Sequence, residues 1–216
     1  MTGNTSKKKL VVALSVIAVV VVAAIVSVVA VLAAPAQVVN SQVSVSYTVT
    51  DVSATVGARY AVANSAIVDA GEITFTADND GTVEGSLNFI DTDSETPIPE
   101  NINLTSTNNY VVFEFKFTNN ATLAFDATLS AIPTTVTNMV LSYAVKTEAV
   151  ADFDTITDYT VFYDQVNETK VNNVASVTDE VAGSGVSYIY IKAAIDDLNT
   201  GANLDGAFSW NLAAVA

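Results

Sequence analysis

The sequence of residues 43–50 reads VSVSYTVT, and this strict alternation decides the fold class. Apolar side chains occupy the odd positions and hydroxylated side chains occupy the even ones. A repeat of two residues is the period of a β-strand that buries one face and exposes the other. Similar alternation occurs at residues 113–118, 139–145, 188–192 and 208–212. Strands of this kind are typical of antiparallel sheets that have one solvated side.

Turn-forming residues separate these windows. Asp78-Asn79-Asp80-Gly81 predicts a hairpin between the strands on either side of it, because Asn and Gly tolerate positive φ. Asn119-Asn120 predicts a second hairpin, which joins residues 113–118 to residues 123–129. We therefore expect residues 37–216 to form one exported all-β domain, an antiparallel two-sheet sandwich or jelly roll of about nine or ten strands. Short helical stretches are expected only near residues 148–153 and 193–198.

Residues 1–36 form a separate segment with its own composition. Lys7, Lys8 and Lys9 precede an apolar run over residues 10–34, which is long enough for one N-terminal helix that spans a bilayer. The A-x-A sequence that places Ala34 and Ala36 around Pro35 is typical of signal-peptidase sites. A cleaved signal peptide, a retained signal anchor and a class III pilin leader are three readings of this segment. Each of them places the remainder of the chain outside the cell.

Composition excludes several classes of function. The chain has no Cys and no His, so it lacks thiol nucleophiles, disulfides, Ser-His-Asp triads and histidine-ligated metals. The formal net charge is −15. Residues 37–216 hold five basic and all 23 acidic residues, a difference of −18. An acidic domain repels phosphate backbones, so no nucleic-acid partner is expected.

The acidic residues suggest weak calcium candidates. Carboxylates from loops that converge at one end of a sandwich could bind Ca²⁺, which takes six to eight oxygen ligands. The alternative is that these carboxylates are simply solvated. The candidates are Asp152, Asp154, Asp158, Asp196 and Asp197. The segment around Asp78 is not an EF-hand loop, because Thr76 and Leu87 stand where the first and last acidic ligands are required.

No residue pattern predicts catalysis, and we expect a protein that is not an enzyme and needs no cofactor. The sequence offers no way to choose a glycosidase pair among 23 acids, and the single tryptophan, Trp210, lies on an apolar alternation that predicts a core position. Lys116 and Asn211 suggest an isopeptide bond like those of some pilins. Lys116 lies on the polar side of its strand, however, which favours an ordinary solvated lysine.

A family resemblance rests on two segments. Residues 113–130 read FEFKFTNNATLAFDATLS, and residues 206–212 read GAFSWNL. The first segment, within residues 110–132, resembles the strand–turn–strand of the TasA/camelysin family, and the second resembles its last strand. Those proteins are exported biofilm-matrix fibre proteins with archaeal bundling-pilus relatives. The region PAQVVN at residues 35–40 departs from the start that mature members of that family often have.

The resemblance implies a jelly-roll subunit whose N-terminal strand inserts into the sheet of a second copy, with residues 37–50 as the donor region. Backbone hydrogen bonds would supply affinity and alternate side chains would set the register. The apolar face of the assembly strand consists of Val39, Val43, Val45, Tyr47 and Val49. The alternative is that these residues form the domain's own first strand.

Two functions follow as expectations. The first is a structural subunit of an extracellular fibre, pilus or biofilm matrix that assembles with copies of itself. The second is a secreted or membrane-anchored adhesion or ligand-binding module at the cell surface, with Ca²⁺ as a candidate ligand. In both, contact with a membrane is made only by the N-terminal helix.

Overall fold

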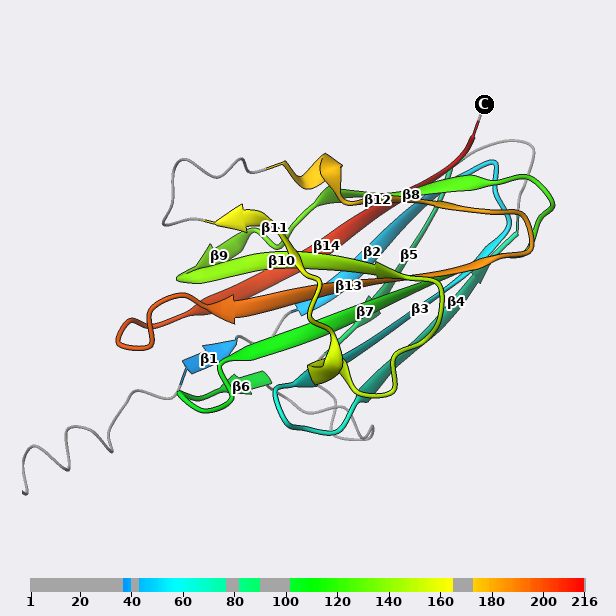
Figure 1. Ribbon diagram of the computed structural model, residues 1–216. Coiled ribbons are helices and arrows are strands. Elements are labelled where there is room, and N and C mark those ends of the chain that lie inside the picture. The colour runs from blue at the N-terminus through cyan, green and yellow to red at the C-terminus, as the bar shows by residue number, and fades with distance from the viewer. Residues whose placement is uncertain (1–36, 40–42, 77–81, 90–101, 165–172, 216) are drawn as a thin grey trace, which may run out of the picture. The chain divides into compact units, whose positions relative to one another are not determined.

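The computed structural model describes residues 37–39, 43–76, 82–89, 102–164 and 173–215 (Figure 1). The chain divides into two compact units, Met1–Pro35 and Ala36–Ala216, and all described residues belong to the second. The predicted N-terminal helix and the cleavage residues Ala34 and Ala36 lie outside the described residues. Within the described ranges, no helix combines the length and apolar character needed to cross a membrane.

The described residues of the second unit form two six-stranded sheets, which we name sheet I and sheet II. Sheet I has the order β11 (Thr160–Asp164), β10 (Met139–Lys146), β13 (Val186–Ile195), β7 (Tyr110–Asn119), β3 (Ala54–Val62) and β4 (Val68–Phe75). Sheet II has the order β12 (Thr178–Val181), β8 (Phe125–Ala131), β14 (Asn203–Ala214), β2 (Val43–Thr50) and β5 (Thr82–Asn88), and β9 (Thr135–Thr137) pairs with the start of β14. A further small sheet joins β1 (Gln37–Val39) to β6 (Ile102–Leu104).

The all-β class and the two sheets are as predicted, but the details differ. The described residues hold fourteen strands rather than nine or ten, because β3 and several short strands lack a clear alternation. Residues 193–195 end β13 instead of starting a helix. The only helical turns in the described part of the chain are the 3-10 segments Phe153–Thr155 and Val174–Ser176.

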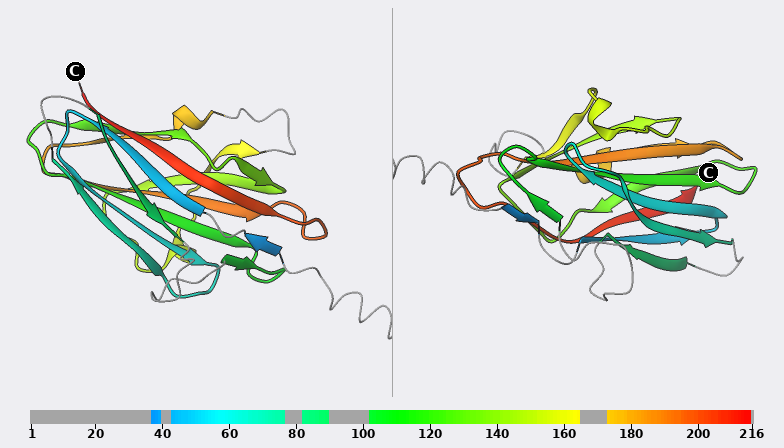
Figure 2. Two further views of the ribbon diagram at one scale, coloured as in Figure 1. Left: turned by 180° about the vertical axis from the view of Figure 1, so that it is seen from behind. Right: turned by 90° about the horizontal axis from the view of Figure 1, so that it is seen from below.

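Both predicted hairpins are wrong. Strands β4 and β5 belong to different sheets, and so do β7 and β8, so each connection crosses from one sheet to the other (Figures 1 and 2). Buried Asn119 shapes the second crossing. Its Nδ2 donates to the carbonyls of Leu123 at 2.8 Å and Val181 at 3.0 Å, and its Oδ1 accepts from the N–H of Ala121 at 2.8 Å. Turn-forming residues suit a hairpin and a crossing equally, so local sequence did not separate the two.

The core lies between the sheets and is rich in aromatic rings. The alternating residues of β2, β7 and β14 all turn their apolar side chains inward, as predicted. Trp210 is fully buried, and its ring centroid lies 5.2 Å from that of Phe115 and 5.0 Å from that of Phe117. These edge-on and tilted contacts are favourable for aromatic pairs and fix the spacing of the two sheets.

The outer side of sheet I is not the solvated face that its alternation predicted. Residues 147–159, here called the covering segment, run across it, and Phe153 and Ile156 pack onto Tyr190, Val112 and Ala144. The Phe153 and Tyr190 ring centroids are 5.3 Å apart. Sheet I is therefore buried on both faces over part of its area, which explains why β3 lacks a simple alternation and why the polar face predicted for β13 is partly buried.

Candidate assembly site

Strand β2, the predicted assembly strand, lies between β5 and β14 in sheet II of its own chain, as the alternative interpretation expected (Figure 2). It pairs antiparallel with β5 and parallel with β14. The parallel pair corrects the prediction of a purely antiparallel sandwich, and it arises because strands from opposite ends of the chain need no hairpin to meet. We call the space between the facing backbone edges of β5 and β14 the slot.

The inward side chains of β2 are buried as their alternation predicted. Val43, Val45, Tyr47 and Val49 have at most 3% of their surface exposed. The Tyr47 ring lies 6.4 Å from both the Phe75 and the Phe117 ring, centroid to centroid. Val39 is separate from this face, since it belongs to β1 and pairs with Ile102. The predicted face is thus divided between two strands.

Two polar atoms in this part of the core have no partner. The Tyr47 hydroxyl and the Trp210 Nε1 are buried without a hydrogen bond to any described residue. The two residues are directly paired across β2 and β14. Burial alone raises the pKa of Tyr47 far above its ordinary value of 10.0, so the hydroxyl stays neutral. An unpaired buried hydroxyl lowers the free energy of unfolding, and this holds for any β2 that occupies the slot.

The outward side chains of β2 form short polar links to both neighbours. Ser46 Oγ donates to Ser209 Oγ of β14 at 2.9 Å. The Thr50 and Thr82 hydroxyls are 3.3 Å apart across β2 and β5. These links lie on the outer face of sheet II and supplement the backbone ladder without adding charge.

The connection from β2 to β3 is short and conformationally restricted. It consists of residues 51–53, and Asp51 has φ of +57°, a left-handed conformation that is uncommon outside glycine. Val52 is buried, and the N–H of Asn120 donates to the Ser53 carbonyl at 2.9 Å. This connection carries the chain from β2 in sheet II to β3 in sheet I.

The first group of calcium candidates has other roles. The Asp154 carboxylate accepts from the Asn64 N–H and from the Tyr110 hydroxyl, each at 2.8 Å, and so fastens the covering segment to sheet I. Burial, with this hydrogen bond as the next cause, raises the pKa of Tyr110 to about 12. Asp152 caps the 3-10 turn by accepting from the Asp154 N–H at 3.0 Å. Asp158 binds Lys146 Nζ through both oxygens at 2.7 and 2.8 Å.

The second group lies in a different connection. Asp197 accepts from the Asn199 N–H and the Thr200 hydroxyl, each at 2.9 Å, and these bonds within its own turn lower its pKa. Asp196 is exposed beside it. In the described ranges, no three acidic residues come together in a way that could hold a metal ion. The structure therefore does not assemble the five candidates into one calcium site.

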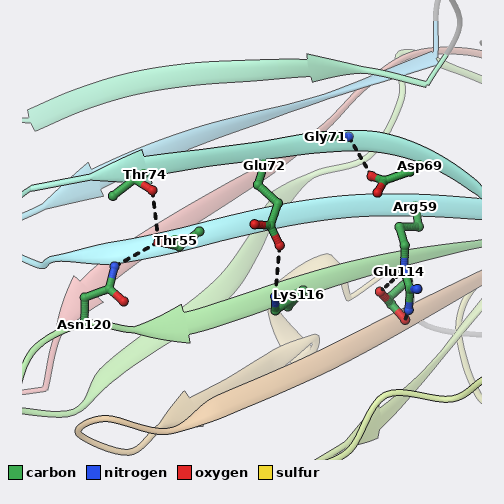
Figure 3. A network of polar contacts seen from close by, with 9 residues as sticks. All are labelled: Thr55, Arg59, Asp69, Gly71, Glu72, Thr74, Glu114, Lys116 and Asn120. Atoms are coloured by element: carbon green, nitrogen blue, oxygen red, sulfur yellow. Dashed lines mark hydrogen bonds and ion pairs between the residues drawn. The ribbon is translucent and has the colours of Figure 1, made fainter.

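A buried carboxylate, that of Glu114, faces Arg59 on the outer face of sheet I (Figure 3). Glu114 is 1% exposed, and both of its oxygens accept from the Arg59 guanidinium at 2.7 and 2.6 Å. The Tyr190 hydroxyl donates to Glu114 at 2.8 Å and accepts from the Val150 N–H at 2.9 Å. This series of contacts ties β3, β7 and β13 to the covering segment.

Lys116 lies two residues after Glu114 on β7, on the same face of sheet I, and its Nζ binds a Glu72 carboxylate oxygen at 2.9 Å (Figure 3). Gly57, between them, leaves the room for this contact, because a Cβ there would come within 3.2 Å of the Glu72 side chain. The candidate isopeptide partner Asn211 is exposed on β14 of sheet II, so Lys116 and Asn211 are not neighbours. The ordinary lysine favoured by the sequence is the correct description.

A hollow of about 200 Å³ opens beside these ion pairs, lined by Arg59, Glu72, Glu114, Lys116 and Tyr188 among others. Both of its cations already bind carboxylates of the same face. The hollow therefore presents few free groups to a ligand, and it gives the ligand-binding hypothesis no specific support.

Sequence reasoning missed the burial of Glu114 and the covering segment. One signal was available: Tyr188 and Tyr190 place two aromatic rings on the side of β13 that was expected to face water. Large rings on a nominally polar face indicate that something covers that face.

No protein-family model, no curated protein and no solved structure matches this chain. The case for a function therefore rests on the geometry of β2 and its neighbours.

Proposed function

We propose that the chain is an exported structural subunit that assembles with copies of itself into an extracellular fibre, by donation of β2. The observation that carries the proposal is the position of β2, a strand close to the N-terminal end of its unit, in a slot between β5 and β14. The likeness to TasA/camelysin proteins points to the same mode of assembly.

The strand order supports a jelly roll that is complete apart from this slot. In a jelly roll the first and last of eight strands are neighbours in one sheet. Here β5, β7, β8 and β10 to β14 follow that order through the two sheets, and β2 alone separates the first of them from the last. Strand β2 is thus an insertion, and a copy of β2 from another chain would fit the same edges.

Strand β2 is also the one central strand of sheet II that can leave without breaking the jelly-roll connections. It joins β3 at one end only, and its other end leads back toward β1. A β2 from a second copy would make the same backbone pairs with β5 and β14 and bury the same four side chains. Exchange therefore preserves the contacts, and if each copy fills the slot of the next, the contact propagates as a filament.

The experiment uses the absence of cysteine in the chain. We combine Ser46→Cys with Ser209→Cys in residues 36–216, the unit that holds its own core, and oxidise the protein. Donation in a fibre links each chain to two others and gives a covalent ladder on non-reducing gels, with filaments in negative-stain micrographs. Monomers alone, or a product that stops at dimers, would refute the fibre.

A matched control carries Thr128→Cys and Thr178→Cys. These hydroxyls lie 3.1 Å apart on β8 and β12, which the proposal leaves in one chain. The control must stay monomeric on the same gel after oxidation, so that a ladder from the first variant reports β2 exchange and not random contact between surface thiols.

A further inference from the structure

The direction of β2 in the slot fixes where a second copy must lie. Strand β2 runs parallel to β14, with Val43 opposite Gly206 and Thr50 opposite Ala213. Any β2 that keeps this register leaves the slot at the end of the sandwich where β14 finishes. We call this end the distal end; it carries the C-terminus in Figure 1. The body of the donating chain follows residue 50, so it lies beyond the distal end.

Exposed apolar side chains gather at this same end. Six large hydrophobic residues are exposed in the described part of the chain, and four of them lie here: Val83, Leu123, Val186 and Val215. Val83 and Val186 lie at the starts of β5 and β13. Val215 lies beside the residue that follows Leu123, because the Val215 N–H donates to the Ala124 carbonyl at 3.1 Å. Leu123 is 74% exposed, the largest value among the six.

The remaining two residues lie elsewhere. Leu198 belongs to the connection between β13 and β14, at the opposite end, and Val161 lies on the edge strand β11. Four of the six at one end of the sandwich is an uneven distribution, and exposed apolar side chains that share one end suit an interaction site. One of the four, Val83, lies beside the slot, because it pairs with Val49 of β2.

We propose that the distal end, centred on Leu123 and Val215, is the docking surface for the body of a second copy of this chain whose β2 occupies the slot. This inference rests on the proposed function. The domain carries a difference of −18 between basic and acidic residues, so two copies repel each other over most approaches. The connection between the two bodies is short, because only residues 51–53 join β2 to β3. The bodies therefore lie close together at the distal end, and apolar contact there offsets the repulsion.

The test compares Leu123→Asp with Leu198→Asp in the chain that carries Ser46→Cys and Ser209→Cys. Both add one carboxylate at an exposed leucine, but only the first lies at the distal end. We expect Leu123→Asp to raise the protein concentration needed for half-maximal cross-linking between chains by about tenfold or more, as for other interface residues that matter. Leu198→Asp and the conservative Leu123→Met should leave that concentration unchanged.

The outcomes separate the two proposals. Cross-linking of Leu123→Asp at the wild-type concentration, or equal loss with Leu198→Asp, overturns the docking surface while strand donation stands. Absence of any ladder in the parent chain overturns strand donation itself. Thermal unfolding of each variant, with wild-type Tm required, ensures that a lost ladder reports lost docking and not lost folding.

Discussion

Removal of a single oxygen atom from Tyr47 should stabilise the protein. In Tyr47→Phe the core loses a hydroxyl that is buried without a partner among the described residues, while the ring contacts with Phe75 and Phe117 remain. An unsatisfied buried polar group costs about 1–3 kcal/mol, and we take the smaller figure because loss of the oxygen leaves a small empty space beside the ring. A gain of about 1 kcal/mol corresponds to a rise in Tm of about 2–4 °C for a chain of this size.

Tyr190→Phe is the matched control, since it makes the same chemical change at a fully buried tyrosine. Here the hydroxyl holds two bonds, one to the Glu114 carboxylate and one from the Val150 N–H. A bond to a charged group is worth about 1.5–3 kcal/mol, so Tm should fall by about 3–12 °C. The two substitutions are thus expected to change Tm in opposite directions.

Thermal unfolding followed by circular dichroism, with urea unfolding as a second measurement, decides the matter. A lower Tm for Tyr47→Phe would mean that its hydroxyl has a partner, and the description of this hydroxyl as unpaired would be wrong. An unchanged Tm for Tyr190→Phe would show that the contacts around Glu114 do not stabilise the covering segment.

Three further predictions concern charges and the connection after β2. Glu114→Gln should lower the free energy of unfolding by about 3 kcal/mol, because it leaves Arg59 without its buried partner, whereas Glu72→Gln at the exposed pair should change it by less than about 1 kcal/mol in the same urea titration. The hydrogen bond from Lys146 lowers the pKa of Asp158 below its ordinary 3.8, so this carboxylate stabilises the fold above about pH 4. The stabilisation disappears as the pH falls through the folded-state pKa. Tm measured against pH should therefore show wild type losing its advantage over Asp158→Asn below about pH 4. Asp51→Pro should increase the cross-linked ladder of the Ser46→Cys, Ser209→Cys chain, because proline cannot adopt the φ of +57° that seats β2 in its own chain, and a reduced ladder would contradict a role for residues 51–53 as the hinge.

The inward faces of individual strands could be predicted from the sequence. Val43, Val45, Tyr47 and Val49 alternate with hydroxylated residues, and all four are buried. Trp210 was expected in the core for the same reason and is fully buried. These predictions succeed because the side-chain period of a strand is a local property that a few neighbouring residues reveal.

The pairing of the strands could not be predicted in this way. Asn119-Asn120 is a turn sequence, yet it carries the chain from sheet I to sheet II instead of closing a hairpin. The parallel contact of β2 with β14 joins residues at opposite ends of the domain. Neither arrangement leaves a signal in the nearby sequence, because each depends on strands that are distant along the chain.

The sequence by itself determined the all-β class, the acidic domain without Cys or His, and the inward faces of the main strands. Only the tertiary structure decided that Glu114 is buried against Arg59, that the calcium candidates serve separate turns and ion pairs, and that β2 fills a slot between β5 and β14. The physical reason is the range of the interactions. Alternation and composition act within a few residues, whereas burial of a charge and occupation of a slot depend on side chains that meet from distant parts of the chain.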